Sequence, residues 1–249
     1  MKKYKIADLI VHLESKSERV IRQGKIYEIP PDSRFNDFSP DIIIKPSKEK
    51  LEKMFRENPH LTFDECDYIE TGSIFYYKLL RYNGFMLHAS AIAYEDNAYL
   101  FSAPSGTGKS THTDQWQQYF GTEKAIIIND DKPAIRLIDN RFYVFGTPWS
   151  GKSDKNLDIK VPLKGIVFLE QSPENWIQSI SVSEAIYLIF NQTLFALTQD
   201  QMNVLLSLLD QLLSRMVIFK MGCTISQEAV ELAYQTLNQK QQEIQQQEL

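Results

Sequence analysis

The alternation of apolar and polar residues changes character at Gly84 and predicts a mixed α/β chain. Before this glycine, short β-type patterns are followed by helical ones. The expected elements are β-type segments at 4–12, 19–29 and 41–46, a helix over 47–59 that Ser47 caps, and a mostly helical run over 69–83. Residues 1–83 are therefore expected to form an N-terminal α+β extension.

Beyond Gly84, the pattern predicts strands that alternate with helices, so we expect residues 84–249 to form a second unit with helices at its C-terminal end. The Gln-rich end of the chain is expected to fray. The expected elements are hairpins over 85–103 and 134–146, strands over 124–130, 163–171 and 216–222, a helix over 110–120, helices after residue 183 with an apolar stripe at Leu205, Leu208, Leu209, Leu212 and Met216, and a last helix that Ser226 caps.

Composition narrows the class of protein. The chain has 249 residues, of which 43% are hydrophobic, so it can form a buried core. This length fits one domain with an extension or two small domains. A net charge of −5 argues against nucleic acid as a partner, and no apolar run is long enough to span a membrane. The start lacks the features of a signal peptide, and the two cysteines have no metal spacing, so a cytoplasmic protein is expected.

The segment "LFSAPSGTGKST" runs from an apolar strand through a loop of small residues into a helix. Such a loop directs several backbone N–H groups at one point, and the helix adds the positive end of its dipole, which together suit a phosphate tail. Lys109 is expected at the terminal phosphates and Ser110 on Mg²⁺, while Gly106 and Gly108 stand where a side chain would block the approach. Ala103 departs from the full motif, which has glycine there. The expected nucleotide-binding residues are Ser105, Gly106, Thr107, Gly108, Lys109, Ser110 and Thr111.

Two adjacent carboxylates follow the next apolar strand, in "AIIINDDKP". Asp130 and Asp131 would leave the strand at its carboxyl end, where ligands bind in open α/β sheets. One can hold a metal while the other accepts a proton, and we take Asp130 as the base and Asp131 as the metal ligand. A solvated turn would explain this segment taken alone, but the upstream loop favours a site. Such an aspartate positions water in an NTPase and accepts a hydroxyl proton in a kinase.

The segments "MLHASAIAYEDNAYLFSAPSGTGKST", "IIINDDKPAIR" and "VPLKGIVFLE" together resemble the catalytic domain of the HPr kinase/phosphorylase family. That family is similar in fold to the ATP-dependent phosphoenolpyruvate carboxykinases. The resemblance spans roughly residues 84–220. It implies a P-loop mixed β-sheet with flanking helices, an ATP–Mg²⁺ site, and phosphoryl transfer to a hydroxyl, often of serine. It also implies that His88 lies near the reacting phosphate.

The chain departs from this family in the region that handles the acceptor. The family's acidic signature before the strand at 163–171 is missing, and "GTPWSGKSDKN" at 146–156 replaces the usual substrate loop, so HPr itself is not expected as the substrate. This segment, with Trp149 in it, could close over a site, where Lys152 and Lys155 would neutralise charge on the transferred phosphoryl group. A surface hairpin loop with solvated lysines is equally compatible with the pattern.

Taken together, these features predict an ATP- and Mg²⁺-dependent kinase whose acceptor is a hydroxyl, of serine on a peptide or protein or of a small molecule. The expected catalytic residues are His88, Asp130, Lys109 and Lys152, with Ser110 and Asp131 on the metal. A nucleotide-sensing module without catalysis is one alternative. A carboxykinase-type enzyme is another, which Asp158 disfavours because an arginine would be expected near that position. The expected partners are the nucleotide and the acceptor, with no nucleic acid and no membrane. A homo-oligomer is compatible with the sequence.

Overall fold

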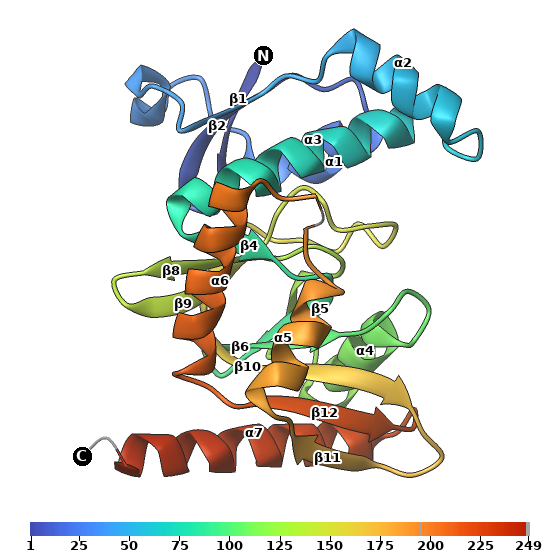
Figure 1. Cartoon of the computed structure of the whole chain (residues 1–249), viewed down its shortest axis with the longest axis vertical. Coiled ribbons are helices and arrows are strands. Elements are labelled where there is room, and N and C mark those ends of the chain that lie inside the picture. The colour runs from blue at the N-terminus through green and yellow to red at the C-terminus, as the bar shows by residue number, and fades with distance from the viewer. Residues whose placement is uncertain (195, 248–249) are drawn as a thin grey trace.

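The computed structural model describes residues 1–194 and 196–247, with side chains as far as residue 239. Within these residues, the strands form one sheet of three strands and one of nine (Figure 1). The small sheet and three helices lie at the N-terminal end of the molecule, and the large sheet with the remaining helices forms the rest. The fold is therefore mixed α/β.

The N-terminal part is built on a β-hairpin and a long helix. The strands of the hairpin pair antiparallel, and the second of them pairs in parallel with β3. The elements are β1 (Lys2–Ile6), β2 (Leu9–Leu13), α1 (Glu18–Gly24), η1 (Lys25–Tyr27), η2 (Arg34–Asp37), β3 (Ile42–Ile44), α2 (Lys48–Glu57), α3 (Phe63–Leu79) and η3 (Leu80–Tyr82).

The large sheet is mixed and curled. Its strand order is β4-β8-β9-β10-β6-β5-β7, and β12 pairs with both β10 and β11. The first residues of the long strand β10 pair antiparallel with β9, whereas its later residues lie parallel to β6 and β12. This change of partners along one strand accompanies the curl of the sheet. The strands are β4 (Gly84–Met86), β5 (Ala89–Tyr94), β6 (Asn97–Ser102), β7 (Ile126–Asn129), β8 (Ala134–Ile138), β9 (Arg141–Phe145), β10 (Lys160–Gln171), β11 (Trp176–Ser179) and β12 (Ile218–Cys223).

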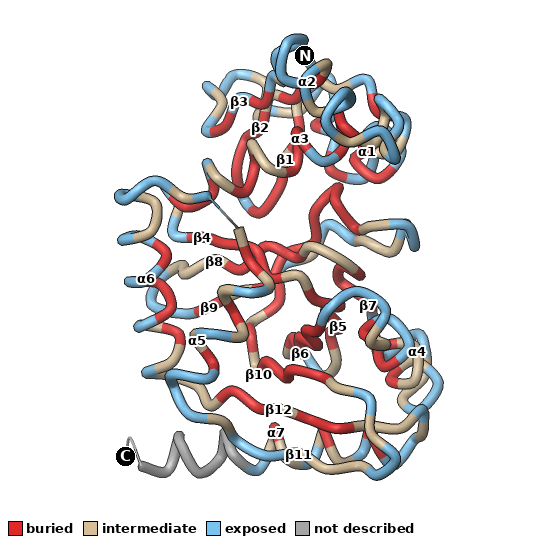
Figure 2. The backbone as a smooth tube through the Cα atoms, turned by 45° about the vertical axis from the view of Figure 1, so that its right-hand side comes forward, coloured by how far each residue is buried: buried red, intermediate tan, exposed pale blue. Residues whose placement is uncertain are grey.

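Helices cover both faces of this sheet. The helices are α4 (Lys109–Phe120), α5 (Val182–Phe190), α6 (Gln199–Leu213) and α7 (Gln227–Gln247). Side chains of β6 alternate between two cores: Leu100 packs with α5 and α6, and Phe101 packs with α4 and α7. This alternation is what a strand buried on both faces requires, and Figure 2 shows the central strands buried.

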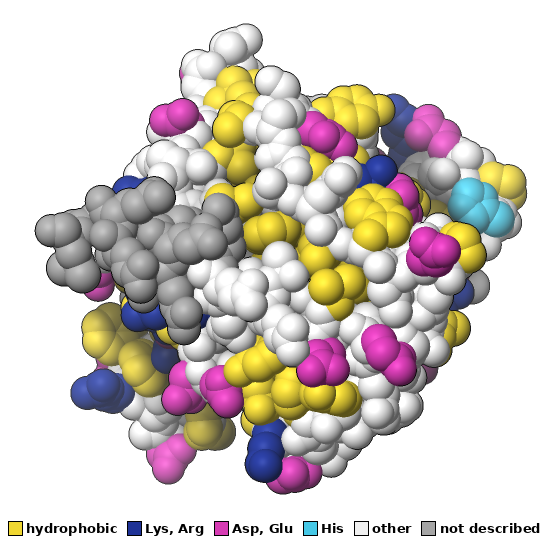
Figure 3. Space-filling model, turned by 90° about the horizontal axis from the view of Figure 1, so that it is seen from below, with side chains coloured by type: hydrophobic (Ala, Val, Ile, Leu, Met, Phe, Trp, Pro, Cys, Tyr) yellow, Lys and Arg dark blue, Asp and Glu magenta, His cyan; other side chains and the backbone are white. Residues whose placement is uncertain are grey.

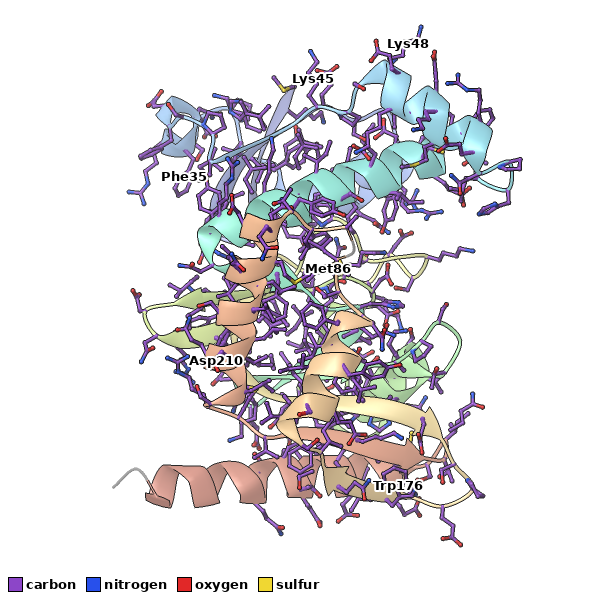
Figure 4. All side chains as sticks on the ribbon, in the orientation of Figure 1. Phe35, Lys45, Lys48, Met86, Trp176 and Asp210 are labelled. Carbon is purple, nitrogen blue, oxygen red and sulfur yellow. The ribbon has the colours of Figure 1, made fainter. Side chains whose placement is uncertain are left out.

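A third core joins the N-terminal part to the large sheet. Apolar side chains of β1, β2, β3 and α3 pack there with Met86, Ala134, Phe145 and Trp149. Met86 lies beneath α3, between the two parts (Figure 4). The small sheet is thus part of one continuous packed structure with the strands that carry the expected site.

Several expected elements are confirmed. The hairpin of β5 and β6, the hairpin of β8 and β9, and helix α2 with Ser47 as its N-cap all form. In α6, the four leucines of the expected stripe are buried, whereas Met216 is half-buried beyond the end of the helix. Ser226 accepts the Ala229 N–H at the start of α7. The Gln-rich segment forms part of α7 as far as Gln247, and its side chains from residue 240 on lie outside the described residues, as do residues 248–249.

The expectation for residues 19–29 is wrong, because this segment forms α1 and η1. Ser17 caps the helix by accepting the Val20 N–H. The buried positions Val20, Gln23 and Tyr27 have helical spacing, but the polar Gln23 hides the pattern. Residues 4–12 are likewise two strands rather than one, because Ala7 and Asp8 adopt positive φ and turn the chain. The helix expected over 69–83 begins earlier, at Phe63, after a Thr62–Glu65 capping box.

No helix among the described residues is both long and apolar enough to cross a bilayer. On the face that contains α7 and β11, apolar and acidic side chains are interspersed, and basic ones are scattered over the part drawn in colour (Figure 3).

Strand directions decide where the expected site residues meet. Strand β5 is antiparallel to both β6 and β7, so β6 and β7 run in the same direction. Their carboxyl ends therefore lie at the same edge of the sheet. The loop of small residues follows β6, and the two aspartates follow β7.

Candidate functional site

A cleft of about 690 Å³ opens at this edge of the sheet. Of the residues expected from the sequence to form the site, His88, Ser105, Gly106, Gly108, Lys109, Ser110, Thr111, Asp130, Asp131 and Lys152 all line it. Thr107 lies instead in a second cleft on the other side of the loop, which shares Ser105 and Gly106 with the first. We call these the main cleft and the second cleft.

The loop between β6 and α4 presents backbone donors to the main cleft. Gly106 and Gly108 have φ values of +82° and +119°, which side-chain-bearing residues rarely adopt. A Cβ at either glycine would meet no atom of the chain within 4 Å, so the backbone conformation, rather than a crowded protein neighbour, requires glycine here. No side chain caps α4, so the N–H groups of its first turn are open to an anion.

Lys109 begins α4 and is almost fully buried. Its ammonium donates hydrogen bonds to the carbonyls of Ala103, at 2.8 Å, and Pro104. Burial lowers the pKa of Lys109, although Asp131 and Asp130 oppose the shift. Ser110 and Thr111, the next two residues, have exposed side chains in the first turn of the helix. The loop and the helix start therefore combine one cation with several neutral donors.

Asp130 is buried at the end of β7 and has a neutral partner. Its Oδ1 accepts a hydrogen bond of 2.6 Å from the Ser90 hydroxyl. Ser90 also bonds Thr113 of α4 at 2.8 Å, which links the carboxylate to the helix that begins at the loop. Neither Ser90 nor Thr113 was expected from the sequence: Ser90 is a polar residue within the apolar strand β5, whereas Thr113 lies among other polar residues of α4 and leaves no signal.

Asp131 differs from its neighbour because charged and ionisable groups surround it. Its Oδ1 lies 3.1 Å from Nε2 of His88, and its Oδ2 accepts a hydrogen bond from the Lys132 ammonium. Burial alone would raise the pKa of Asp131, but His88 and Lys132 outweigh it and lower the pKa to about 2. Lys132 was missed, although it directly follows the pair in the sequence.

His88 is held from both sides of its ring. Nδ1 lies 2.9 Å from Oε1 of Gln192, and the backbone N–H of His88 donates to the Gln192 carbonyl. With Asp131 on Nε2, both ring nitrogens face acceptors. Gln192 follows α5, more than a hundred residues away in the chain, and no local signal identifies it.

The turn that carries the two aspartates is fixed by Asn129. Its side-chain oxygen accepts the backbone N–H groups of Asp131 and Lys132, and its Nδ2 donates to the Thr147 carbonyl. The backbone N–H of Asp130 donates to the Lys155 carbonyl. Segment 146–156 is therefore packed directly against the pair.

Segment 146–156 is neither a free lid nor a solvated hairpin. Residues 146–150 are buried, and Trp149 stacks on Phe75 of α3 with 5.0 Å between ring centroids. Only residues 152–154 have exposed side chains. Lys155 pairs with Asp114 of α4 at 2.6 Å, which ties the end of the segment across the cleft. Lys152 is exposed and has no hydrogen bond or ion pair among the described side chains.

The N-terminal part contributes to the main cleft, which the sequence analysis did not anticipate. Arg19 of α1 and Glu65, Tyr68 and Ile69 of α3 line it, together with Leu61. The Tyr68 hydroxyl accepts the backbone N–H of Gly151 at 2.9 Å. No motif marks these residues, because they belong to an ordinary helix-packing pattern.

The donor set suits a magnesium ion only if phosphate completes it. Among the described residues, no group of three or more His, Cys, Asp or Glu could hold a metal ion. Mg²⁺ in phosphoryl-transfer sites takes one or two protein ligands, with the remainder from phosphate oxygens and water. The Ser110 hydroxyl and the aspartate pair, all lining the cleft, fit this second kind of site.

Comparison with protein families decides which family the chain belongs to. The family model described as "SynChlorMet cassette protein ScmC" matches residues 66–235. The chain belongs to the ScmC family. The ScmC match begins in α3 and ends in α7, so it includes the loop, the aspartate pair and segment 146–156 but leaves out α1 and Arg19.

Other comparisons add little to the ScmC assignment. No curated protein matches the chain. Among solved structures, the Hpr(Ser) kinase/phosphatase from Coxiella burnetii matches over 49% of this chain and 86% of that one, with 12% identity and a TM-score of 0.27.

Proposed function

We propose that this protein is an ATP- and Mg²⁺-dependent kinase that transfers the γ-phosphate to the hydroxyl of a serine on a peptide or protein. The observation that carries the proposal is that two groups of residues line one cleft. The first is the uncapped start of α4 with Lys109, and the second is the Asp130–Asp131 pair with His88. The first group suits a phosphate tail, and the second suits a metal and an acceptor proton. A small-molecule hydroxyl remains the second candidate acceptor, because the cleft is open enough for either.

The loop and the first turn of α4 would bind the β- and γ-phosphates, with Lys109 leaving its loop carbonyls to reach them. The nucleoside would then lie in the second cleft, beyond Gly106 and away from the aspartates. The lining of the second cleft includes Phe168 of β10 and Tyr187 and Leu188 of α5, which offer apolar surface to a base.

Tyr187→Ala is expected to weaken ATP binding several-fold and to leave the binding of tripolyphosphate, which has no base, unchanged. Calorimetry measures both affinities. Equal weakening of both would contradict the placement of the nucleoside in the second cleft.

The two aspartates have environments suited to different roles. Asp131, with its pKa lowered to about 2, stays ionised and is a weak proton acceptor, which suits a ligand of Mg²⁺ beside Ser110. Asp130 has only a hydroxyl partner on one oxygen among the described residues, so its other oxygen can accept the acceptor's proton. When Mg²⁺ is bound, it would neutralise charge on the transferred phosphoryl group. His88, held by Gln192, would orient Asp131.

The proposal is tested by phosphoryl transfer from γ-labelled ATP with Mg²⁺. The acceptors are serine peptides, the same peptides with alanine for serine, and small hydroxyl compounds. We expect label on serine peptides only. Label on the small compounds alone would favour the second candidate. ATP binding without transfer to any acceptor would contradict the kinase and favour a nucleotide-sensing module.

A further inference from the structure

One wall of the main cleft is rich in hydrogen-bond donors that have no partner. Arg19 of α1 lies over the Tyr68 ring, with its guanidinium carbon 5.0 Å from the ring centroid. It makes no hydrogen bond or ion pair with any side chain that the structure describes, yet it lines the cleft. An arginine fixed on an aromatic face and left unpaired is a prepared site for a planar anion.

Segment 150–152 adds further donors to this wall. The Ser150 side chain is buried and lines the cleft, and its Oγ has no hydrogen-bond partner. A buried hydroxyl without a partner is costly, so a ligand that accepts from it is expected. The Tyr68 oxygen accepts from Gly151, which leaves its own hydrogen free, and Lys152 stands beside it at the rim.

The acidic side chains near this wall already have partners. Asp131 is paired with His88 and Lys132, and Asp154 is paired with Arg22 and Gln23. Glu65 accepts hydrogen bonds from the backbone and hydroxyl of Thr62 in the capping box of α3. These bonds lower the pKa of Glu65, with smaller contributions from Arg19 and Lys152. Because these carboxylates already have partners, Arg19 and Lys152 are left with positive charge that an anion can bind.

We propose that this wall binds a carboxylate that the acceptor carries next to its reactive hydroxyl, with Arg19, Ser150 and Lys152 as its partners. The inference rests on the proposed function and names the chemistry of its acceptor. It also assigns Lys152 to the acceptor rather than to the transferred phosphoryl group. The carboxylate can belong to an acidic residue beside serine in a peptide or to a free hydroxy acid.

The wall is held in place before any acceptor arrives. Gln23 of α1 donates to the Gly151 carbonyl, at 2.8 Å, and to Asp154. Arg22 pairs with Asp154 at 3.0 Å. Two residues of α1, Gln23 and Arg22, thus hold the segment that carries Ser150 and Lys152. A preorganised site loses less entropy on binding.

The test measures binding of short fluorescent serine peptides to the full chain with Mg²⁺ and a non-hydrolysable ATP analogue. One peptide has aspartate on each side of serine, and its partner has asparagine. We expect the aspartate peptide to bind about tenfold more tightly than the asparagine peptide. This factor corresponds to the lower end of the range of free energies that a charge-assisted hydrogen bond contributes. Arg19→Gln should reduce this preference to near parity, and Ser150→Ala and Lys152→Gln should each reduce it in part.

Lys25→Gln is the matched control, because it removes one positive charge from the residue after α1, outside the cleft. It should keep the full preference. Glycerate as a competitor distinguishes the two sources of the carboxylate. Displacement of the peptide by glycerate points to a free hydroxy acid as the acceptor, and no displacement points to a peptide. Equal affinity for the two peptides, binding of neither, or a preference that survives Arg19→Gln overturns the inference. Because the analogue cannot transfer phosphate, this result is independent of whether the kinase proposal holds.

Discussion

At the scale of single residues, the environment differentiates two chemically identical side chains. Asp130 and Asp131 are adjacent, yet a neutral hydroxyl bonds the first, and a lysine and a histidine bond the second. A cationic partner stabilises the ionised form of a carboxylate much more than a hydroxyl does. This difference supports the proposed assignment of Asp131 to metal binding and of Asp130 to proton transfer.

Two substitutions separate phosphate binding from proton transfer. Lys109→Ala is expected to abolish nucleotide binding and turnover. Asp130→Asn is expected to leave nucleotide binding within a few-fold and to lower the transfer rate by about 10²–10⁴-fold, as for loss of a general base. Calorimetry and the labelled-phosphate assay check the two effects, with the exposed Lys124→Ala as control. Full activity in either variant would remove that residue from the mechanism.

The lowered pKa of Asp131 predicts how stability depends on pH. Because the pKa falls from 3.8 to about 2 on folding, the ionised group stabilises the fold above about pH 4, and this contribution is lost as the pH falls toward 2. Asp131→Asn should lower the free energy of unfolding by about 2 kcal/mol at pH 6, and by less at pH 3. Urea unfolding at both pH values measures this, with the exposed turn residue Asp96→Asn as control. A difference independent of pH would contradict the ion-pair explanation.

At the scale of elements, segment 146–156 is positioned by its buried half. Trp149 stacks on Phe75, and its indole N–H donates to Thr71 of α3. A Cβ at Gly72 would lie 2.9 Å from the indole ring, so glycine at this helix position leaves room for it. The exposed half of the segment, which carries Lys152, therefore begins at a fixed position beside Asp131.

Trp149→Ala is expected to destabilise the protein by about 3–5 kcal/mol, the usual cost of truncating a buried tryptophan. It should also make segment 150–155 more sensitive to protease under native conditions, because its anchor is lost. Trp149→Phe, which can keep the stacking on Phe75, should cost less. Denaturant unfolding and limited proteolysis measure both effects, and a loss under 1 kcal/mol for Trp149→Ala would contradict the anchoring role.

At the scale of the whole molecule, the two parts share a core and a cleft. Met86, Ala134, Phe145 and Trp149 pack on the small sheet and α3, and Arg19 and Tyr68 reach the main cleft from the N-terminal side. The extension therefore lines the cleft in which we propose that the acceptor binds, and it also covers apolar surface of the large sheet.

Removal of residues 1–83 should expose this shared core. We expect residues 84–249 alone to be poorly soluble and to lack a sharp thermal transition, because apolar groups buried at the junction would face water. The full chain should unfold in a single calorimetric transition. A soluble 84–249 fragment with its own sharp transition would show that the two parts fold independently.

Features carried by a few consecutive residues were predictable from the sequence. The loop from Ala103 to Ser110, the hairpin of β5 and β6 and the Ser47 cap each depend on local conformation, and each forms. The pattern of residues 19–29 predicts a strand, whereas the structure forms helix α1 there, because a buried polar residue, Gln23, interrupts the apolar face of the helix. Arg19 and Ser150 reach the main cleft by packing, and Gln192 lines the second cleft and contacts His88, so none of the three left a local signal.

The sequence by itself determined the mixed α/β class, the conformation of the loop of small residues and the presence of two carboxylates after an apolar strand, because these depend on neighbours along the chain. Only the tertiary structure decided that the carboxylates meet the loop, that His88 faces Gln192 and Asp131, and that α1 and α3 supply a wall of the cleft. Those contacts depend on strand order and on the shared core, which bring together residues far apart in the chain.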